Sequence, residues 1–194
     1  MKKNLLYFVL PVLAVLALAG MDQLVKMWVI ENIELYDSII IWDGVFELTH
    51  IHNEGMAWGL FQNKQVFFII LTPIALLLFG YFYCRTPFTR RFIPIRIAEV
   101  MLAGGAIGNL IDRVFRGEEL FHGKVIDMFY VSAIRFPVFN VADCYITVAC
   151  VILIALVLFY YKDSEFNEMF GFKKNVKETD VPAEVQTEEN DENH

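Results

Sequence analysis

The chain has 194 residues, 57% of them hydrophobic, and it contains 18 phenylalanines. Several uncharged runs approach the ~20 residues that a helix needs to cross a bilayer, so the composition predicts a multispanning membrane protein. The net charge of −7 comes from residues 163–194, which hold ten acidic residues and three lysines, and the neutral remainder argues against a nucleic-acid partner.

The first uncharged run covers residues 4–21 and predicts the first membrane span. Basic residues before it and the A-x-A pattern of Ala17 and Ala19 resemble the ends of a cleavable secretory signal. Because further apolar runs follow and Asp22 comes directly after this one, we expect a retained helix. Asp22 and Lys26 have i, i+4 spacing, so they share a helix face where the helix leaves the hydrocarbon, and a local ion pair is expected.

Residues 34–61 predict a small β-sheet outside the bilayer, between the first two spans. Strand-forming residues lie on both sides of Asp43 and Gly44, which form a two-residue hairpin signal. Asn53 and Gly55 then mark a turn.

The clearest span covers residues 66–84, and a weaker third span covers residues 92–111. Several arginines lie between these two spans, and lysines precede the first span and follow the last one. By the positive-inside rule, this distribution predicts that both termini are cytoplasmic.

Polar and small residues mark the third span. Gly104 and Gly108 form a GxxxG pair, which indicates close helix packing. Asn109, Asp112 and Arg113 follow on one helical face at the outer exit. A structural ion pair between Asp112 and a neighbouring arginine is expected.

A fourth span covers residues 141–161, after a second outer loop at 117–136 that is too mixed in composition to cross the bilayer. Asn140 and Asp143 stand at the N-cap and N3 positions of this span, which is the spacing of a capping pair. Residues 163–194 are predicted to form a disordered, acidic cytoplasmic tail.

The predicted fold is an all-α integral membrane protein with four transmembrane helices. It has a small extracytoplasmic β-sheet between helices 1 and 2, a second outer loop between helices 3 and 4, and a membrane domain at residues 1–162. With both termini inside, polar residues from separate parts of the chain meet at the outer membrane level, and these are Asp22, Lys26, Asn53, Asn109, Asp112, Arg113, Asp127, Asn140 and Asp143.

Asp127 and Asp143 form a candidate catalytic pair. Two carboxylates within hydrogen-bonding distance share one proton and titrate as a coupled pair. The ionised carboxylate can take a proton from water, while the protonated one donates to a carbonyl oxygen or a leaving nitrogen. Asp143 lies near the positive end of a helix macrodipole and is the better candidate for the ionised partner. The pair predicts peptide hydrolysis without a metal, a cofactor or a covalent intermediate.

These motifs resemble those of the lipoprotein signal peptidases (signal peptidase II), aspartyl enzymes of the bacterial cytoplasmic membrane. The resemblance covers residues 5–162. Its motifs are Asp22 to Lys26, Asn53 with Gly55, Ala57 and Gly59, Gly104 to Arg113, Val125 to Asp127, and Phe139 to Asp143. Departures such as Val25, where Ser or Thr is usual, leave both carboxylates in place.

The resemblance implies an endopeptidase that removes signal peptides from prolipoproteins by cutting before a diacylglyceryl-modified cysteine. It implies that Asp127 and Asp143 are the catalytic dyad, at the extracytoplasmic face of the inner membrane. Prolipoproteins and membrane lipids are the expected partners, and a monomer is expected. The expected substrate-binding or supporting residues are Asp22, Lys26, Asn53, Gly55, Asn109, Asp112, Arg113 and Asn140.

Three alternatives use other residues. Ser132 and Lys124 lie in the same outer loop and could form a serine/lysine peptidase. Acidic residues could instead form the relay of a proton-coupled transporter. His50 and His52 share a strand face and could bind a metal, but the sequence offers no convincing third ligand, so no metal site is expected. The transporter relay would consist of Asp22, Glu99, Asp112 and Asp143.

Overall fold

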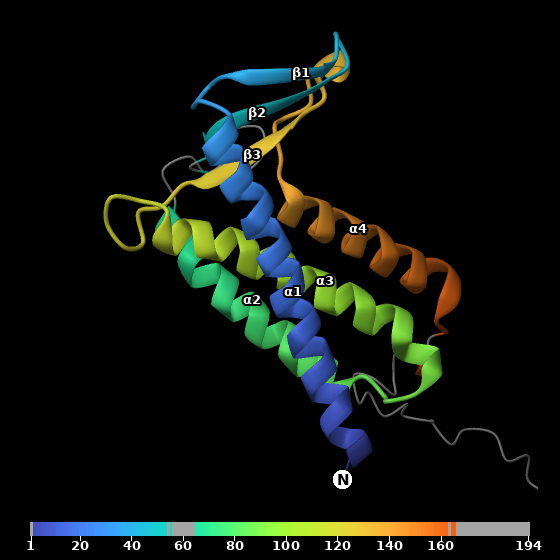
Figure 1. Cartoon of the computed structure of the whole chain (residues 1–194). Coiled ribbons are helices and arrows are strands. Elements are labelled where there is room, and N and C mark those ends of the chain that lie inside the picture. Colours follow the sequence, from blue (N-terminus) through green and yellow to red (C-terminus); the bar gives the residue numbers. More distant parts are fainter. Residues whose placement is uncertain (1, 54, 56–64, 163, 166–194) are drawn as a thin grey trace, which may run out of the picture.

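The computed structural model describes residues 2–53, 55, 65–162 and 164–165. Four long helices form a bundle, and a small sheet covers the end of the bundle opposite the N-terminus (Figure 1). Each helix is long and apolar enough to cross a membrane, as the sequence predicts. The helices are α1 (Lys2–Asn32), α2 (Gln65–Arg85), α3 (Ile93–Phe115) and α4 (Val141–Ala155), which continues into the π-helical turn η4 (Leu156–Tyr160).

The first helix is longer than the uncharged run that predicts it. The run ends at Met21, but α1 continues to Asn32. Asp22 and Lys26 therefore lie inside the helix and not at its exit, and their side chains form an ion pair of 2.8 Å. This pair confirms the expected local contact, and it lets two charged residues stay within one continuous helix.

Helix α3 packs between α1 and α4, and its glycines allow the close approach. A Cβ on Gly104 would lie 2.8 Å from the Cβ of Leu18 on α1. A Cβ on Gly105 would lie 2.6 Å from the carbonyl oxygen of Ala142 on α4. Real Cβ atoms do not approach other atoms this closely, so the close packing predicted from the glycines is confirmed.

The sheet has three antiparallel strands in the order β1 (Ser38–Trp42), β2 (Phe46–Asn53) and β3 (Val125–Tyr130). β1 and β2 form the predicted hairpin, and Gly44 has the positive φ of +67° that its turn requires. β3 comes from the second outer loop, for which the sequence indicated no strand. It pairs with β2 so that Ile51 lies opposite Asp127.

A small apolar core fixes the sheet to the end of α1. Val29 and Ile33 from the last turns of α1 pack against Ile126 and Met128 from β3, and all four are buried. This contact holds the strand that carries Asp127 against the helix that carries Asp22 and Lys26.

The opposite end of the bundle is closed by aromatic and ionic contacts. The rings of Phe92 and Tyr161 stack with their centroids 5.3 Å apart. Arg91 forms an ion pair of 2.8 Å with Glu165, and hydrogen bonds from Arg91 and from the Lys162 amide lower the pKa of Glu165 to about 2. These contacts fix the end of α4 against the start of α3.

Candidate active site

Asn140 begins α4 and connects the two candidate carboxylates. Its side-chain oxygen accepts a hydrogen bond of 3.0 Å from the Asp143 amide, and its backbone amide donates to Asp143 Oδ2 at 3.2 Å. This is the capping box predicted from the spacing. The Asn140 amide nitrogen Nδ2 also donates to Asp127 Oδ1 at 2.7 Å and to Asn109 Oδ1 at 3.0 Å. The cap is therefore also a bridge between Asp127 and Asp143.

Asp127 lies in the middle of β3 and is 2% exposed. Each carboxylate oxygen accepts an amide hydrogen bond, one from Asn140 and one of 2.8 Å from Asn53 Nδ2. Burial raises the pKa of Asp127 to about 7, and the nearby charge of Asp143 acts in the same direction. The two amide donors oppose this rise, because they favour the charged form.

Asp143 lies in the first turn of α4 and is half-buried. Its Oδ1 accepts a hydrogen bond of 2.9 Å from Asn109 Nδ2, and its Oδ2 accepts the one from the Asn140 backbone. The first turn of a helix carries a partial positive charge, which favours an ionised carboxylate. Asp143 thus lies where a negative charge is stabilised.

A fully buried lysine, Lys26, lies next to Asn109, which contacts Asp143. Lys26 Nζ is 2.8 Å from Asp22 Oδ2, 2.6 Å from Asp112 Oδ2 and 3.1 Å from Asn109 Oδ1. Asp22 Oδ1 also accepts a hydrogen bond of 2.9 Å from the Ala142 amide, in the first turn of α4. Removing one partner of a buried ion pair costs several kcal/mol, roughly 3–5, because the other charge is left uncompensated. The network therefore fixes α1, α3 and the start of α4 to one another.

Asp112 extends this network to the end of α3. Its Oδ1 lies 2.8 Å from Arg116 Nε, which confirms the expected pair with a neighbouring arginine, and its Oδ2 accepts from the Ile126 amide of β3 at 3.3 Å. Gln23 joins the same cluster, donating to Asp112 Oδ1 at 3.0 Å and accepting from Arg116 at 2.9 Å. Gln23 was not among the residues predicted for this site. The available signal was its place in a short polar stretch of α1, at i, i+3 spacing from Lys26.

Arg113 connects the helices to the turn after β2. Its guanidinium donates to the carbonyl oxygens of Asn109 at 3.1 Å and Gly55 at 3.2 Å, and it lies over the ring of Phe68 on α2. The Gly55 amide donates to Asn53 Oδ1 at 2.9 Å, which orients the amide that contacts Asp127. Ala57 and Gly59 of the same predicted motif lie outside the described residues.

The structure brings all the candidate residues together. Hydrogen bonds and ion pairs join them into one connected network in which Asp127 and Asp143 share Asn140 as a common partner. Among the residues that the structure describes, no group of three or more His, Cys, Asp or Glu is arranged to hold a metal ion. The joined residues are Asp22, Lys26, Asn53, Gly55, Asn109, Asp112, Arg113, Asp127, Asn140 and Asp143.

The serine/lysine pair and the complete transporter relay are not brought together, whereas the His50 and His52 rings do lie side by side, with their centroids 5.3 Å apart. Lys124 precedes β3 and Ser132 begins the short helix η3 (Ser132–Ile134) beyond it. The six residues of β3 and Val131 separate them, and the strand alone spans about 20 Å at the rise of a β-strand, so they cannot exchange a proton directly. Glu99, a member of the transporter relay, lies in a pocket whose other lining residues are apolar or weakly polar.

Comparisons with known proteins agree with this geometry. The family model of signal peptidase (SPase) II matches residues 14–159. The lipoprotein signal peptidase of Lactococcus lactis subsp. lactis is 38% identical over 156 residues, covering 80% of this chain and 95% of that protein. The lipoprotein signal peptidase of Clostridioides difficile is 39% identical over 155 residues, covering 80% of this chain and 99% of that protein.

Two solved structures of bacterial membrane enzymes have the same fold. One has a TM-score of 0.67 at 27% identity and covers 90% of this chain and 95% of its own. The other has a TM-score of 0.65 at 27% identity and covers 79% of this chain and 96% of its own. The resemblance inferred from the motifs is confirmed, and the chain belongs to the signal peptidase II family of bacterial membrane peptidases.

Proposed function

We propose that this chain is an aspartyl endopeptidase that removes the signal peptide from prolipoproteins, cutting before the diacylglyceryl-modified cysteine. The family supports the substrate class. The observation that carries the mechanism is the bridge at Asn140, which hydrogen-bonds both carboxylates, Asp127 through its side chain and Asp143 through its backbone amide. Asn140 thus holds the two acids close together and leaves both of them available for proton transfer.

The charges around the site support one shared proton. Four carboxylates belong to the network, and three cations contact or lie close to them. If all seven groups were ionised, the site would carry one uncompensated negative charge in a poorly hydrated place, which is costly. One proton on the Asp127/Asp143 pair removes that charge. The three cations in this count are Lys26, Arg113 and Arg116, and the four carboxylates are Asp22, Asp112, Asp127 and Asp143.

Asp127 is the better holder of this proton. It is nearly fully buried and has a pKa of about 7, whereas Asp143 is half-buried and lies at the start of α4. In the proposed reaction, Asp143 takes a proton from water while the water oxygen bonds to the scissile carbonyl carbon. Asp127 donates its proton to the carbonyl oxygen.

The second half of the reaction restores the dyad. Asp143 returns a proton to the leaving nitrogen as the carbon–nitrogen bond breaks, and the hydroxyl of the tetrahedral intermediate returns its proton to Asp127 as the carbonyl re-forms. The products are the free signal peptide and a mature protein whose modified cysteine is its N-terminus. No covalent enzyme intermediate forms, and the dyad ends with the single proton with which it began.

The remaining network residues have positioning roles in this scheme. Asn53 and Asn140 orient Asp127, Asn109 orients Asp143, and Lys26 keeps Asn109 in place. Asp22, Asp112 and Arg113 fix the helices and the turn at Gly55 around them. We place this site at the extracytoplasmic face, with both termini in the cytoplasm, because the basic residues concentrate at the opposite end of the bundle.

Cleavage of a defined substrate tests this proposal. Purified full-length protein is incubated with one prolipoprotein in two forms, with and without the diacylglyceryl group, and the new N-terminus is identified by mass spectrometry. Cleavage directly before the modified cysteine, with little cleavage of the unmodified form, is expected. Ser132→Ala should cleave at the wild-type rate. Equal cleavage of both forms, or loss of cleavage in Ser132→Ala, would overturn the proposal.

A further inference from the structure

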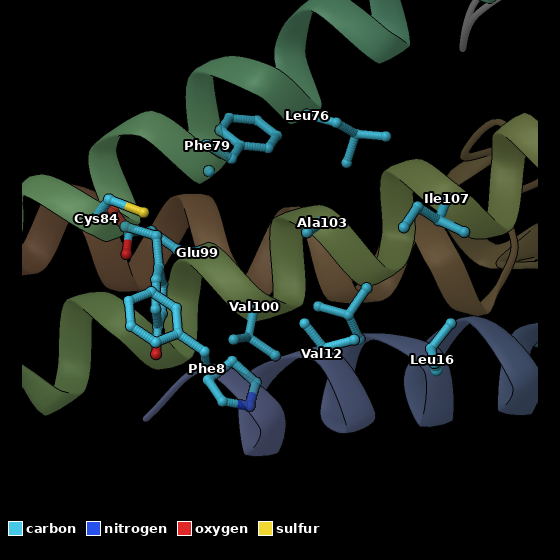
Figure 2. A pocket seen from close by; sticks show the side chains of 14 residues that line it. Phe8, Val12, Leu16, Leu76, Phe79, Cys84, Glu99, Val100, Ala103 and Ile107 are labelled. Carbon is cyan, nitrogen blue, oxygen red and sulfur yellow. The ribbon is translucent and has the colours of Figure 1, made fainter. Parts of the chain in front are cut away.

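A pocket lies between α1, α2 and α3 (Figure 2) and extends along α3 from Glu99 to Ile107. Its volume is about 380 Å³, within the range of small-molecule sites. α1, α2 and α3 each contribute apolar side chains to its walls, among them Phe8, Val12, Leu76, Phe79, Val100 and Ala103. Such walls fit a hydrocarbon chain, and the volume is too small for another helix.

The pocket also contains buried polar atoms that have no partner within the described chain. Glu99 lines it on α3, close to Cys84 in Figure 2, and is 7% exposed. Its Oε2 makes no hydrogen bond in the part of the protein that the structure describes. Burying an unpaired polar atom costs free energy, roughly 1–3 kcal/mol, so an unpaired carboxyl oxygen in an apolar wall suggests a bound partner.

Arg96 lies one helical turn from Glu99 and has the same property. It is 8% exposed, and its guanidinium donates to the carbonyl oxygen of Thr86 and lies over the rings of Tyr83 and Phe88. Its Nε and Nη1 make no hydrogen bond within the described residues. One acceptor and two donors are thus available beside a hydrocarbon-lined pocket.

Two exposed arginines lie at the end of α2 and in the connection from α2 to α3, two of the helices that form the pocket. Arg85 ends α2 directly after Cys84, a lining residue, and Arg90 begins the short helix η2 (Arg90–Phe92). Both side chains are exposed. Basic groups beside a pocket between transmembrane helices are the usual recognition elements for anionic lipid headgroups.

From these observations we propose that the pocket binds one acyl chain of an anionic phospholipid with a hydroxyl-bearing headgroup, as in phosphatidylglycerol. The acyl chain lies between α1, α2 and α3. Arg96 donates to an ester carbonyl oxygen, a headgroup hydroxyl donates to Glu99 Oε2, and Arg85 and Arg90 attract the phosphate. The polar end of this site, at Glu99, lies at the end of the bundle opposite the peptidase site, and its apolar walls extend along α3 as far as Ile107.

The test uses purified full-length protein in zwitterionic phosphatidylcholine nanodiscs. A trace of phosphatidylglycerol with a diazirine at the end of one acyl chain is photolysed, and the labelled residues are mapped by mass spectrometry. Phosphatidylcholine with the same diazirine chain is the control lipid. With the anionic lipid, labels are expected on the pocket walls, for example at Val12 and Ala103. The yield of these labels should exceed the yield with phosphatidylcholine roughly fivefold for each contributing arginine.

Two further comparisons make the result decisive. Arg85→Gln combined with Arg90→Gln should remove the lipid preference, whereas Arg135→Gln, an exposed arginine at the sheet end, should keep it. Equal pocket labelling by both lipids would overturn the proposal. Labels confined to outward-facing residues such as Leu77, or a preference that survives loss of both arginines, would also overturn it.

Discussion

At the scale of single residues, Asn140 determines how the two candidate carboxylates meet. A capping residue normally satisfies only the free amides of its own helix. Asn140 does this for α4 with its side-chain oxygen, and its side-chain nitrogen also donates to Asp127 of another element. The capping spacing was predictable from the sequence. The contact with Asp127 was not, because it depends on β3 lying beside the start of α4.

The first prediction concerns the pH dependence of catalysis. The pKa of Asp127 is about 7, so the protonated form, which acts as the acid, is lost as the pH rises through that value. Asn53 donates to Asp127 and favours its charged form. Asn53→Ala should therefore raise this pKa and move the alkaline limb of the kcat/KM profile to higher pH, while lowering the maximal rate. Initial rates measured between about pH 5 and 9 provide the profile.

Asn32→Ala is the matched control for this measurement. The Asn32 side chain is exposed and donates to the Trp28 carbonyl at the end of α1, and among the described residues it makes no hydrogen bond to a carboxylate of the network. It should leave the profile unchanged. An alkaline limb that stays in place or moves to lower pH in Asn53→Ala would contradict the assignment of Asp127 as the acid.

The second prediction concerns stability. The pKa of Asp127 rises from 3.8 to about 7 on folding, so the folded chain holds a proton that the unfolded chain releases in this range. The free energy of unfolding therefore falls as the pH rises from about 4 to 7. Asp127→Asn has no such proton to lose, so its stability does not fall in this way. The free energy of unfolding of the variant minus that of wild type should therefore be about 2–3 kcal/mol larger at pH 8 than at pH 5.

Thermal unfolding followed by tryptophan fluorescence in detergent measures this difference at the two pH values. Asp43→Asn, which removes an exposed carboxyl in the hairpin turn, corrects for the loss of one charge. A stability difference between Asp127→Asn and wild type that does not grow with pH would contradict the burial argument.

At the scale of elements, the sequence predicted the four helices because each contains a long apolar run. It did not predict that the first helix continues to Asn32, since a charged pair within a helix cannot be recognised without knowing that Asp112 neutralises it from α3. It also missed β3. This strand is short, is buried for most of its length and pairs with a strand far away in the sequence, so it has no alternation of polar and apolar residues.

The third prediction tests the packing of α3 against α4. Gly105→Ala would place a Cβ 2.6 Å from the Ala142 carbonyl oxygen, in the turn that carries Asp143. Separating the two helices should cost about 1–3 kcal/mol of stability and lower kcat, because Asn109 on α3 orients Asp143 on α4. Thermal unfolding and substrate turnover measure both effects.

Gly20→Ala on α1 is the matched control. A Cβ at this position meets nothing within 4 Å. It should stabilise the helix by up to about 1 kcal/mol and leave turnover unchanged. If Gly105→Ala behaved like Gly20→Ala, the close packing of α3 on α4 would not support the site.

At the scale of the whole molecule, the fold delivers residues from all parts of the chain to one end of the bundle (Figure 1). α1 supplies Asp22 and Lys26, α3 supplies Asn109, and the strand and helix after it supply the two carboxylates. The motifs allowed the set of residues to be predicted. The local contacts, Asp22 with Lys26 and Asn140 with Asp143, were also predictable from their spacing. The remaining connections required the structure, because they join elements that are distant in sequence.

Replacing each aspartate of the dyad in turn tests the proposed mechanism. Purified wild type, Asp127→Asn and Asp143→Asn are compared in a gel-shift assay on a diacylglyceryl-modified prolipoprotein, after thermal unfolding has established that both variants are folded. The shared-proton mechanism predicts that wild type cleaves the substrate and that each variant loses at least about a hundredfold in rate. Cleavage by either folded variant at close to the wild-type rate would contradict the two-aspartate account.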